Sequence, residues 1–399
     1  MKIQHKKEKL KVSILVSDLS SSGAGRWGGA GVRSFLLAQA LQKLGHQVDI
    51  LGFVFGDEAA VTSQSQIPAY HFNGYNYPKF FLSAAQLLKK IDGDIIYAMR
   101  PKATTFGLSL LKNIGKTRPT ILDIDDWEMS WYGGEKWKYK PSSKQFSRDI
   151  FKSDGALRYP DHPLYLRWME GMVNKANLVT IHTKFLQKKF GGIYIPNGKD
   201  TELFNPENYD SQTSRETYGL SGYKVLMFPG APRPYKGIED VLLALDKLND
   251  PAYKIAIVGG SPYDDYDQKL IQKWGKWIIK LPKFPPHKMP FVVAAAHLVV
   301  VPQRDTPAAL AQFPLKLTDA MSMAKPVLAT NVGDIPEILG DTGYLVAPSS
   351  PEQIAEKIQI IFENLEEANQ KALLARKRCI DFYSIDAMTS ILSDAIAQL

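Results

Sequence analysis

The chain has 399 residues, enough for two ordinary domains, and its 45% hydrophobic and 23% charged residues exclude disorder as the main state. A net charge of +8 favours an anionic partner, but no zinc finger or RNP-type aromatic motif is present, so we expect no nucleic-acid partner. The single cysteine, Cys379, excludes an internal disulfide and a cysteine-based zinc site, and it fits a reducing compartment.

The first half of the chain alternates short apolar runs with longer helical patterns. The run over 11–17 predicts a strand, and a glycine-rich loop then leads to a helix predicted over 32–44, which Gly45 ends. Further strands are predicted over 47–53, 95–99, 120–124 and 178–181. This alternation indicates a parallel sheet with crossover helices.

A polar, turn-rich segment over 205–222 interrupts the pattern before a new strand at 224–228. The alternation then resumes. Strands are predicted over 254–258, 297–301 and 327–329, and helices over 241–248, 315–323, 351–364 and from 372 onward. The second half is therefore predicted to be another α/β domain.

We expect a first Rossmann-like domain over 1–205 and a second over 206–385, with a final helix over 386–399 that packs back on the first. Two similar α/β domains joined by one linker imply a cleft between them, where ligands of open α/β sheets usually bind.

Glycine-rich and basic stretches occur where strands give way to helices, and the N–H groups of helix starts bind anions. The first stretch holds Gly28 and Gly29, with Arg33 nearby, and its small residues allow close approach of the backbone to a bound group. A surface loop is the alternative. The spacing Gly23-x-Gly25-x-x-Gly28 also fits a dinucleotide fingerprint. These glycines lie several residues after the end of the strand, whereas the fingerprint needs them in the tight turn that directly follows it. We therefore do not expect this loop to bind NAD.

The second stretch, over 228–237, lies between a strand and a helix. Arg233 and Lys236 place two positive charges beside the helix start, which suits a diphosphate whose charge grows as a group leaves. Prolines on both sides of Arg233 stiffen the loop, which favours binding over a solvated basic turn.

The third stretch begins a helix near residue 315. Lys316 lies in the first turn, where the helix dipole disfavours a cation, so it needs an anionic partner or simple exposure. Asp319 lies on the same face, three residues on. The pair suits a phosphate and a ribose hydroxyl, and an ordinary surface ion pair is the alternative.

These stretches resemble the retaining glycosyltransferases of family 4, also called group 1, whose GT-B architecture has two Rossmann-like domains with parallel sheets facing across a cleft. The match runs over most of the chain. It comprises Gly28-Gly29, Pro196-Asn197-Gly198-x-Asp200, Leu203-Phe204-x-Pro206, Lys236-Gly237, the run from Ala296 to Pro302, Pro314-x-Lys316-Leu317-x-Asp319-Ala320-Met321, Gly333-x-x-x-x-Glu337 and Gly343-Tyr344-Leu345-Val346.

One departure concerns two glutamates that the family usually carries eight positions apart. The second is here Asp319, which can still accept hydrogen bonds from ribose hydroxyls, and the position of the first is Ala311. The resemblance implies that the first glutamate touches the donor sugar. Contacts to the sugar are therefore expected from the backbone of 308–313.

The resemblance implies a donor site mainly in the second domain, with the base near 281–284 and the ribose against Asp319. The diphosphate is expected against Arg233, Lys236 and Lys316. The donor-binding residues are then Gly28, Gly29, Arg233, Lys236, Gly237, Phe284, Phe313, Pro314, Leu315, Lys316 and Asp319.

An acidic segment ends a strand of the first domain. Asp123 and Asp125 fit the Asp-x-Asp spacing by which other glycosyltransferases hold a divalent metal. The resemblance implies instead that arginine and lysine neutralise the donor phosphates, so we expect no metal and no required cofactor.

The resemblance also implies that an Asp-x-Trp segment here faces the acceptor, although a strand-end cap is the alternative. We assign acceptor binding to Arg33, Asp126 and Trp127, and catalysis to Asp126, Arg233 and Lys316.

Basic residues between 136 and 152 are interleaved with Trp137, Tyr139, Phe146 and Phe151. This mixture suits a membrane surface or an anionic acceptor, and equally a loop packed on its own aromatics.

The longest apolar stretch, over 291–301, is shorter than the roughly 20 residues of a membrane helix. We expect a cytoplasmic protein, with the inner membrane face as a peripheral alternative.

The sequence therefore predicts a hexosyltransferase that uses a UDP-, GDP- or dTDP-sugar. Its acceptor would be a carbohydrate, a lipid-linked sugar or a small molecule, and the resemblance implies retention of anomeric configuration. The alternatives are a non-catalytic protein that binds a sugar nucleotide or a partner, and a nucleotide-sugar epimerase of the same architecture.

Overall fold

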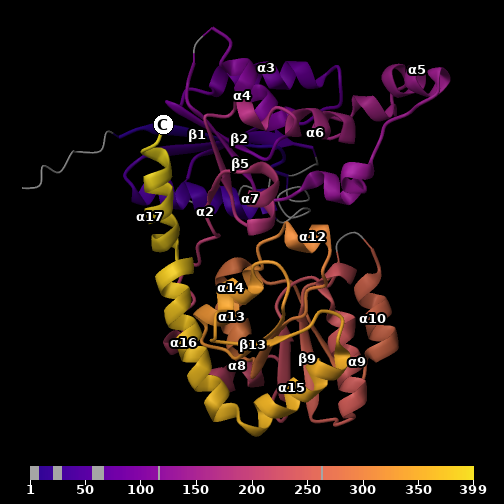
Figure 1. Cartoon of the computed structure of the whole chain (residues 1–399), viewed down its shortest axis with the longest axis vertical. Helices are drawn as coiled ribbons and strands as arrows, with labels where there is room; N and C mark the ends of the chain where they lie inside the picture. Colours follow the sequence, from indigo (N-terminus) through magenta and orange to yellow (C-terminus); the bar gives the residue numbers. More distant parts are fainter. Residues whose placement is uncertain (1–8, 21–28, 56–66, 116, 262–263) are drawn as a thin grey trace, which may run out of the picture. The chain divides into compact units, whose positions relative to one another are not determined.

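The computed structural model describes residues 9–20, 29–55, 67–115, 117–261 and 264–399, and the chain divides into two compact units (Figure 1). The first unit comprises 1–196 and 388–399, and the second comprises 197–387. The boundary expected after residue 205 falls inside the second unit, because Phe204 is buried in that unit's core and its carbonyl accepts a hydrogen bond from Ser322 at 2.9 Å.

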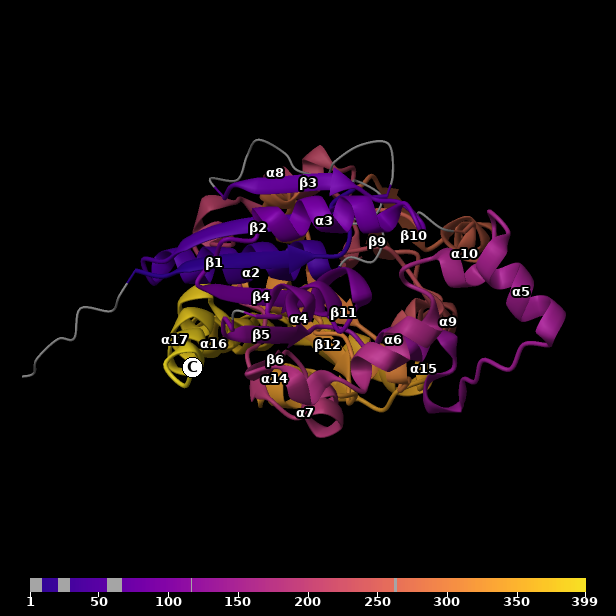
Figure 2. The ribbon, with the colours of Figure 1, turned by 90° about the horizontal axis from the view of Figure 1, so that it is seen from above.

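The first unit is built on a seven-stranded parallel sheet with the order β3-β2-β1-β4-β5-β6-β7 (Figure 2). The strands are β1 (Lys11–Val16), β2 (Gln47–Val54), β3 (Ala69–Asn73), β4 (Ile95–Met99), β5 (Thr120–Ile124), β6 (Leu178–Ile181) and β7 (Ile193–Tyr194). The central strands are continuous apolar runs because both faces of a parallel sheet are covered by helices. The edge strands β3 and β7 were not expected, since they are short and only partly buried.

Helices of the first unit cover this sheet. They are α2 (Gly29–Lys43), α3 (Phe80–Lys90), α4 (Leu108–Lys112), α5 (Ser143–Phe151), α6 (Pro163–Glu170), α7 (Lys184–Phe190) and most of α17 (Ile385–Ile396). Leu37 and Leu41 of α2 enter the same core as Met388 and Leu392 of α17, at the helical spacing of four residues. The last helix therefore completes the core of the first unit.

The second unit has a six-stranded parallel sheet with the order β10-β9-β8-β11-β12-β13. The strands are β8 (Lys224–Phe228), β9 (Tyr253–Val258), β10 (Ile278–Leu281), β11 (Leu298–Val301), β12 (Val327–Thr330) and β13 (Tyr344–Val346). The chain moves from β8 outward to β10 and then returns to add β11 on the other side of β8. The carboxyl ends of β8 and β11 are thus a topological switch point, where open α/β sheets bind ligands.

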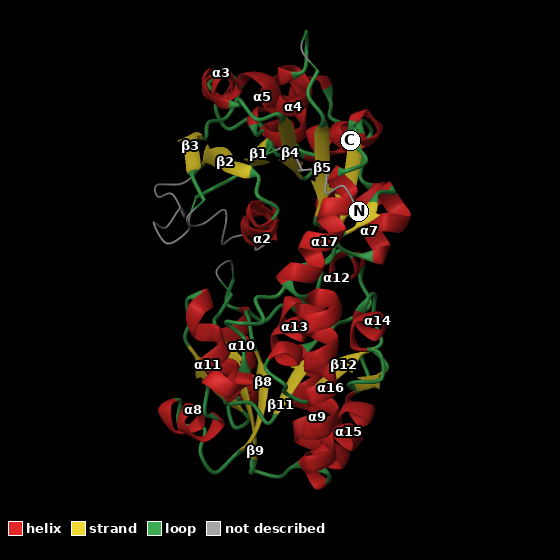
Figure 3. Ribbon diagram, turned by 90° about the vertical axis from the view of Figure 1, so that its left-hand side faces the viewer, coloured by secondary structure: helices red, strands yellow, loops and turns green. Residues whose placement is uncertain are grey.

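Helices lie on both faces of the second sheet (Figure 3). They are α8 (Ser211–Thr217), α9 (Ile238–Leu248), α10 (Tyr266–Trp274), α11 (Met289–Ala294), α12 (Pro307–Leu310), α13 (Leu315–Ser322), α14 (Ile335–Leu339), α15 (Pro351–Glu363) and α16 (Leu365–Tyr383). One core packs α11, α13 and α16 on the sheet, and the other packs α9, α10 and α15. Among the described residues, no helix combines the length and the apolar character needed for a bilayer crossing.

Candidate functional site

Three cations predicted from the sequence come together in the second unit. Arg233 and Lys236 belong to the loop that follows β8, in and next to the short turn η7 (Pro234–Lys236), and Lys316 is the second residue of α13. A Cβ built on Gly230 of this loop would lie 4.0 Å from Cε of Lys316, so the loop and the start of α13 adjoin. The switch point of the sheet therefore carries three positive side chains.

The electrostatics of these cations reflect their closeness. Burial lowers the pKa of Lys236 well below its usual range, and the neighbouring charges of Lys316 and Arg233 lower it further. Burial also lowers the pKa of Lys316 to about 8, and Asp319 opposes this shift. An anion bound between these side chains would favour their charged forms and relieve the repulsion.

Each cation is held in place by a different contact. Arg233 donates from Nη1 to Ser261 at 2.9 Å and to Asp264 at 3.1 Å, whereas Lys236 donates to the carbonyl of Ala231 at 3.0 Å. Lys316 places its Nζ 4.8 Å from the ring centroid of Phe228. Within the described parts of the chain, neither lysine forms an ion pair with a carboxylate, so both ammonium groups keep donors for a ligand.

Asp319 has a partner that sequence reasoning missed. Its Oδ1 accepts a charged hydrogen bond from Nζ of Lys199, which also lies 3.4 Å from the ring centroid of Phe204. Lys199 is the variable position x of the motif Pro196-Asn197-Gly198-x-Asp200. Its place inside this motif is the one sequence feature that could have pointed to a role for it. One oxygen of Asp319 is thus engaged, and the carboxylate keeps acceptor capacity for a ribose hydroxyl.

The remaining predicted donor residues of the second unit line the same strand ends or lie beneath them. Phe284 follows β10 and packs edge-on against Tyr218, with a centroid separation of 5.3 Å. Phe313 is buried in the core, 6.3 Å from the ring of Tyr383, so only its backbone can meet a donor sugar. Pro314 precedes α13 and Leu315 begins it, and the amides of Leu315 and Leu317 donate to the carbonyls of Phe313 and Pro314 at 2.9 and 2.8 Å.

Gly237 has a steric reason for being glycine. Its φ is +69°, and a Cβ there would lie 1.8 Å from the carbonyl oxygen of Pro302. This close approach joins the cation loop to the segment after β11 and starts α9. Gly29, in contrast, is the first residue of α2 in the first unit, and Gly28 lies outside the described residues.

Arg33 occupies a different environment from the one its predicted role requires. Its side chain is only 1% exposed, and Nε and Nη2 donate to the two oxygens of Asp123 at 2.7 and 2.8 Å. Asp123 also accepts from Thr180 at 2.7 Å. A buried charge needs such a partner, so Arg33 belongs to the interior of the first unit rather than to a surface that faces an acceptor.

The neighbouring carboxylate of the Asp-x-Asp pattern also binds an arginine. Asp125 accepts from Nε of Arg100 at 2.6 Å, and Arg100 bridges to Glu128 at 2.6 Å. This network joins the ends of β4 and β5, and sequence reasoning missed it because its members are distant along the chain. Among the described residues, no group of three or more histidine, cysteine, aspartate or glutamate side chains is arranged to hold a metal ion.

Asp126 and Trp127 follow this network and are largely buried, at 3% and 7% exposure. Asp126 accepts from Nε1 of Trp131 at 3.4 Å and from the amide of Trp127 at 2.8 Å. Burial raises the pKa of Asp126 to about 7, and the charge of Glu128 adds to this while Arg100 opposes it. The position gives a carboxyl group that changes protonation near neutral pH.

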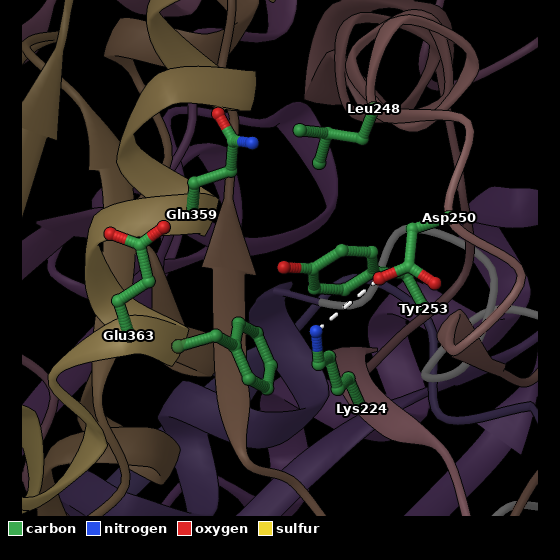
Figure 4. A pocket seen from close by; sticks show the side chains of 7 residues that line it. Lys224, Leu248, Asp250, Tyr253, Gln359 and Glu363 are labelled. Carbon is green, nitrogen blue, oxygen red and sulfur yellow. Dashed lines mark hydrogen bonds and ion pairs between the residues drawn. The ribbon is translucent and has the colours of Figure 1, made fainter.

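A separate cavity of about 190 Å³ lies at the opposite end of the second sheet (Figure 4). Lys224 and Tyr253, the first residues of β8 and β9, line it, and Lys224 pairs with Asp250 at 3.3 Å. The cations described above follow the carboxyl end of β8. This cavity is therefore not part of their site.

Comparisons with known proteins identify a family model and relatives that are similar to this chain. Residues 210–378 match the model of the family Glycosyl transferases group 1. The chain is 25% identical over 224 residues to a GDP-mannose-dependent alpha-(1-6)-phosphatidylinositol monomannoside mannosyltransferase of Mycolicibacterium smegmatis, covering 52% of this chain and 59% of the relative. It is 28% identical over 149 residues to O-antigen chain mannosyltransferase B of Escherichia coli, covering 36% and 38%. The chain spans about half the length of the curated relatives it matches.

Solved structures match over nearly the whole chain. Sucrose-phosphate synthase from Thermosynechococcus elongatus has a TM-score of 0.72 at 17% identity, covering 98% of this chain and 99% of that one. The HepE protein of Anabaena, solved in complex with UDP-glucose, has a TM-score of 0.71 at 20% identity, covering 98% and 100%. These likenesses confirm the expected α/β fold with two Rossmann-like domains of the GT-B architecture.

Proposed function

We propose that this chain, which carries a glycosyl transferases group 1 domain over residues 210–378, moves a hexose-type sugar from a nucleoside-diphosphate donor to an acceptor. The observation that carries the proposal is the cluster of Arg233, Lys236 and Lys316 at the switch point of the second sheet. The cluster repels itself when empty and suits a pyrophosphate in charge and position.

The proposed mechanism relies on electrostatic stabilisation by this cluster. The donor diphosphate lies against the three cations, its ribose against Asp319, and its base near 281–284. As the glycosidic bond breaks, negative charge builds on the leaving phosphate, and fixed cations stabilise that state more than the ground state. Burial lowers the pKa of Lys316 to about 8, and a neighbouring anion stabilises its ammonium form increasingly as that charge grows.

In this proposal Asp126 orients the acceptor, which is a carbohydrate, a lipid-linked sugar or a small molecule, and the anomeric configuration is retained. The leaving phosphate itself receives the acceptor proton, so no general base of the protein is assigned. The relatives favour a GDP- or UDP-sugar as donor, since one is GDP-mannose-dependent and another was solved with UDP-glucose.

The test is transfer from UDP-, GDP- and dTDP-hexoses to a panel of acceptors, measured as released nucleoside diphosphate and as glycosylated product. Lys316→Ala should lower kcat by about 10²- to 10³-fold, the scale of losing one preorganised electrostatic donor. Lys224→Ala is the matched control, because Lys224 lies at the other end of β8 in an exposed pair worth little.

Two results would contradict the proposal. Equal turnover in Lys316→Ala and the unaltered protein would remove the cation from the reaction. Consumption of donor without any acceptor, with a new sugar nucleotide as product, would favour the epimerase instead.

A further inference from the structure

The segment around α5 carries apolar side chains that remain exposed in the described chain. Phe146 and Ile150 lie four residues apart on one face, and Phe151 ends the helix. Their exposures are 47%, 37% and 77%. Figures 1 and 2 both show α5 at the end of an extension of the first unit, away from that unit's sheet.

A different face of α5 anchors the helix. Asp149 is buried, accepts from the hydroxyl of Tyr139 at 2.7 Å and from Nε2 of Gln145 at 2.6 Å. The ring of Tyr139 stacks on Trp137 at 6.4 Å and meets the edge of His162 at 5.3 Å. These hydrogen bonds and ring contacts fix the position of the helix. The exposed apolar face is therefore not needed to anchor the helix on the first unit.

The segment that carries α5 also has uncompensated positive charge. The acidic residues of the segment are neutralised or buried, since Glu135 pairs with Lys189, Asp154 pairs with Arg148, and Asp149 is enclosed. Five lysines of the segment are exposed and form no ion pair in the described parts of the chain. They are Lys136, Lys138, Lys140, Lys144 and Lys152.

We propose that this face of α5, together with the five exposed lysines of the same segment, docks on the surface of an anionic lipid bilayer. A helix with aromatic and aliphatic residues on one side and lysines beside them inserts its apolar side at the level of the headgroups, and the lysines bind anionic lipids. The occupant is a membrane rather than a protein, because lysine is depleted from protein interfaces. Two copies would bring their lysines together and repel each other.

The inference is independent of the proposed sugar transfer, since it needs only the first unit's surface. The test is co-sedimentation of the full chain with vesicles of phosphatidylcholine alone and of phosphatidylcholine mixed equally with phosphatidylglycerol. Binding is expected only to the anionic vesicles, and it should weaken as salt rises because the attraction is screened.

Two variants separate the apolar and the basic contributions. Phe146→Ser/Ile150→Ser/Phe151→Ser should weaken binding by at least about tenfold, since it removes the inserted surface. Lys136→Gln/Lys138→Gln/Lys144→Gln should weaken it by about fivefold for each lysine removed. Thermal unfolding checks that both variants fold.

Control variants remove exposed residues of the same types from the second unit, although Lys269 and Lys276 there pair with Asp265 and Asp246. Leu373→Ser/Leu374→Ser takes two exposed apolar side chains from α16, and Lys269→Gln/Lys273→Gln/Lys276→Gln takes three lysines from α10 and the turn after it. Both controls should bind anionic vesicles as the unaltered protein does. The proposal is overturned if the α5 variants bind as well as the controls, if neutral vesicles bind equally, or if the chain is a dimer that the serine variant dissociates.

Discussion

The carboxyl group of Asp126 is almost fully buried. Its protonation therefore changes the free energy of unfolding of the protein. Its folded-state pKa is about 7, above the ordinary 3.8. The folded protein therefore keeps a proton that the unfolded chain releases between about pH 4 and 7. The resulting stability is fully present below the ordinary pKa and is lost as the pH rises through 7.

Asp126→Asn should remove this pH dependence, because an amide does not titrate. Thermal unfolding of the variant and of the unaltered protein should show that the variant gains relative stability between pH 5 and pH 8. Glu128→Gln is a useful comparison, since Glu128 lies in the same network but its pKa is lowered. A midpoint difference between Asp126→Asn and the unaltered protein that stays constant from pH 5 to pH 8 would show that Asp126 is already ionised when folded.

The sequence could predict which charged residues at helix starts suit an anion. It could not predict which residues form ion pairs with one another in the folded chain. Lys236 and Lys316 were identified because cations beside glycine or proline at a helix start suit anions. The Lys199–Asp319 and Arg33–Asp123 pairs join residues 120 and 90 positions apart, and only the folded chain brings them together. Arg33 was assigned to the acceptor because neither periodicity nor spacing reveals that its charge is buried.

At the scale of elements, the turn at Gly237 links the cation loop to α9. Gly237→Ala should both destabilise the second unit and weaken donor binding, because the new methyl group would collide with the carbonyl oxygen of Pro302 and displace Lys236. Denaturant unfolding and binding of nucleoside diphosphate measure the two effects.

Gly219→Ala is the control for backbone strain alone. Gly219 has a φ of +66°, close to that of Gly237, but a Cβ there meets nothing within 4 Å. The control should lose roughly 1 kcal/mol of unfolding free energy and keep its affinity. Equal effects of the two substitutions would mean that the close approach to Pro302 does not position the loop.

Central strands were predictable because burial on both faces leaves continuous apolar runs such as Val299 to Val301. The prediction of 11–17 agrees with β1 to within one residue. The edge strands β3 and β7 were not predicted, because β3 is mostly exposed and β7 has only two residues. Neither strand leaves a periodic apolar pattern in the sequence. Strand order also depends on pairings that no local pattern encodes.

At the scale of the whole molecule, the chain leaves the first unit at residue 196 and returns to it at residue 388. Deleting 388–399 should destabilise the first unit selectively, because Met388, Leu392 and Ala395 are fully enclosed in its core. Scanning calorimetry should show the first unit's transition moving down while that of the second unit stays.

Deleting only 397–399 is the control, since these residues are exposed. It should leave both transitions in place. If the longer deletion leaves the first transition unmoved, then α17 does not complete that core.

The most direct test of the account is calorimetric titration of a nucleoside diphosphate and of the corresponding nucleoside. The unaltered protein should bind UDP or GDP, and Lys236→Ala/Lys316→Ala should weaken that binding by about 100-fold or more, since two charge-assisted contacts are lost. Affinity for the nucleoside should be the same in both proteins. A diphosphate affinity that survives the double substitution unchanged would contradict the account.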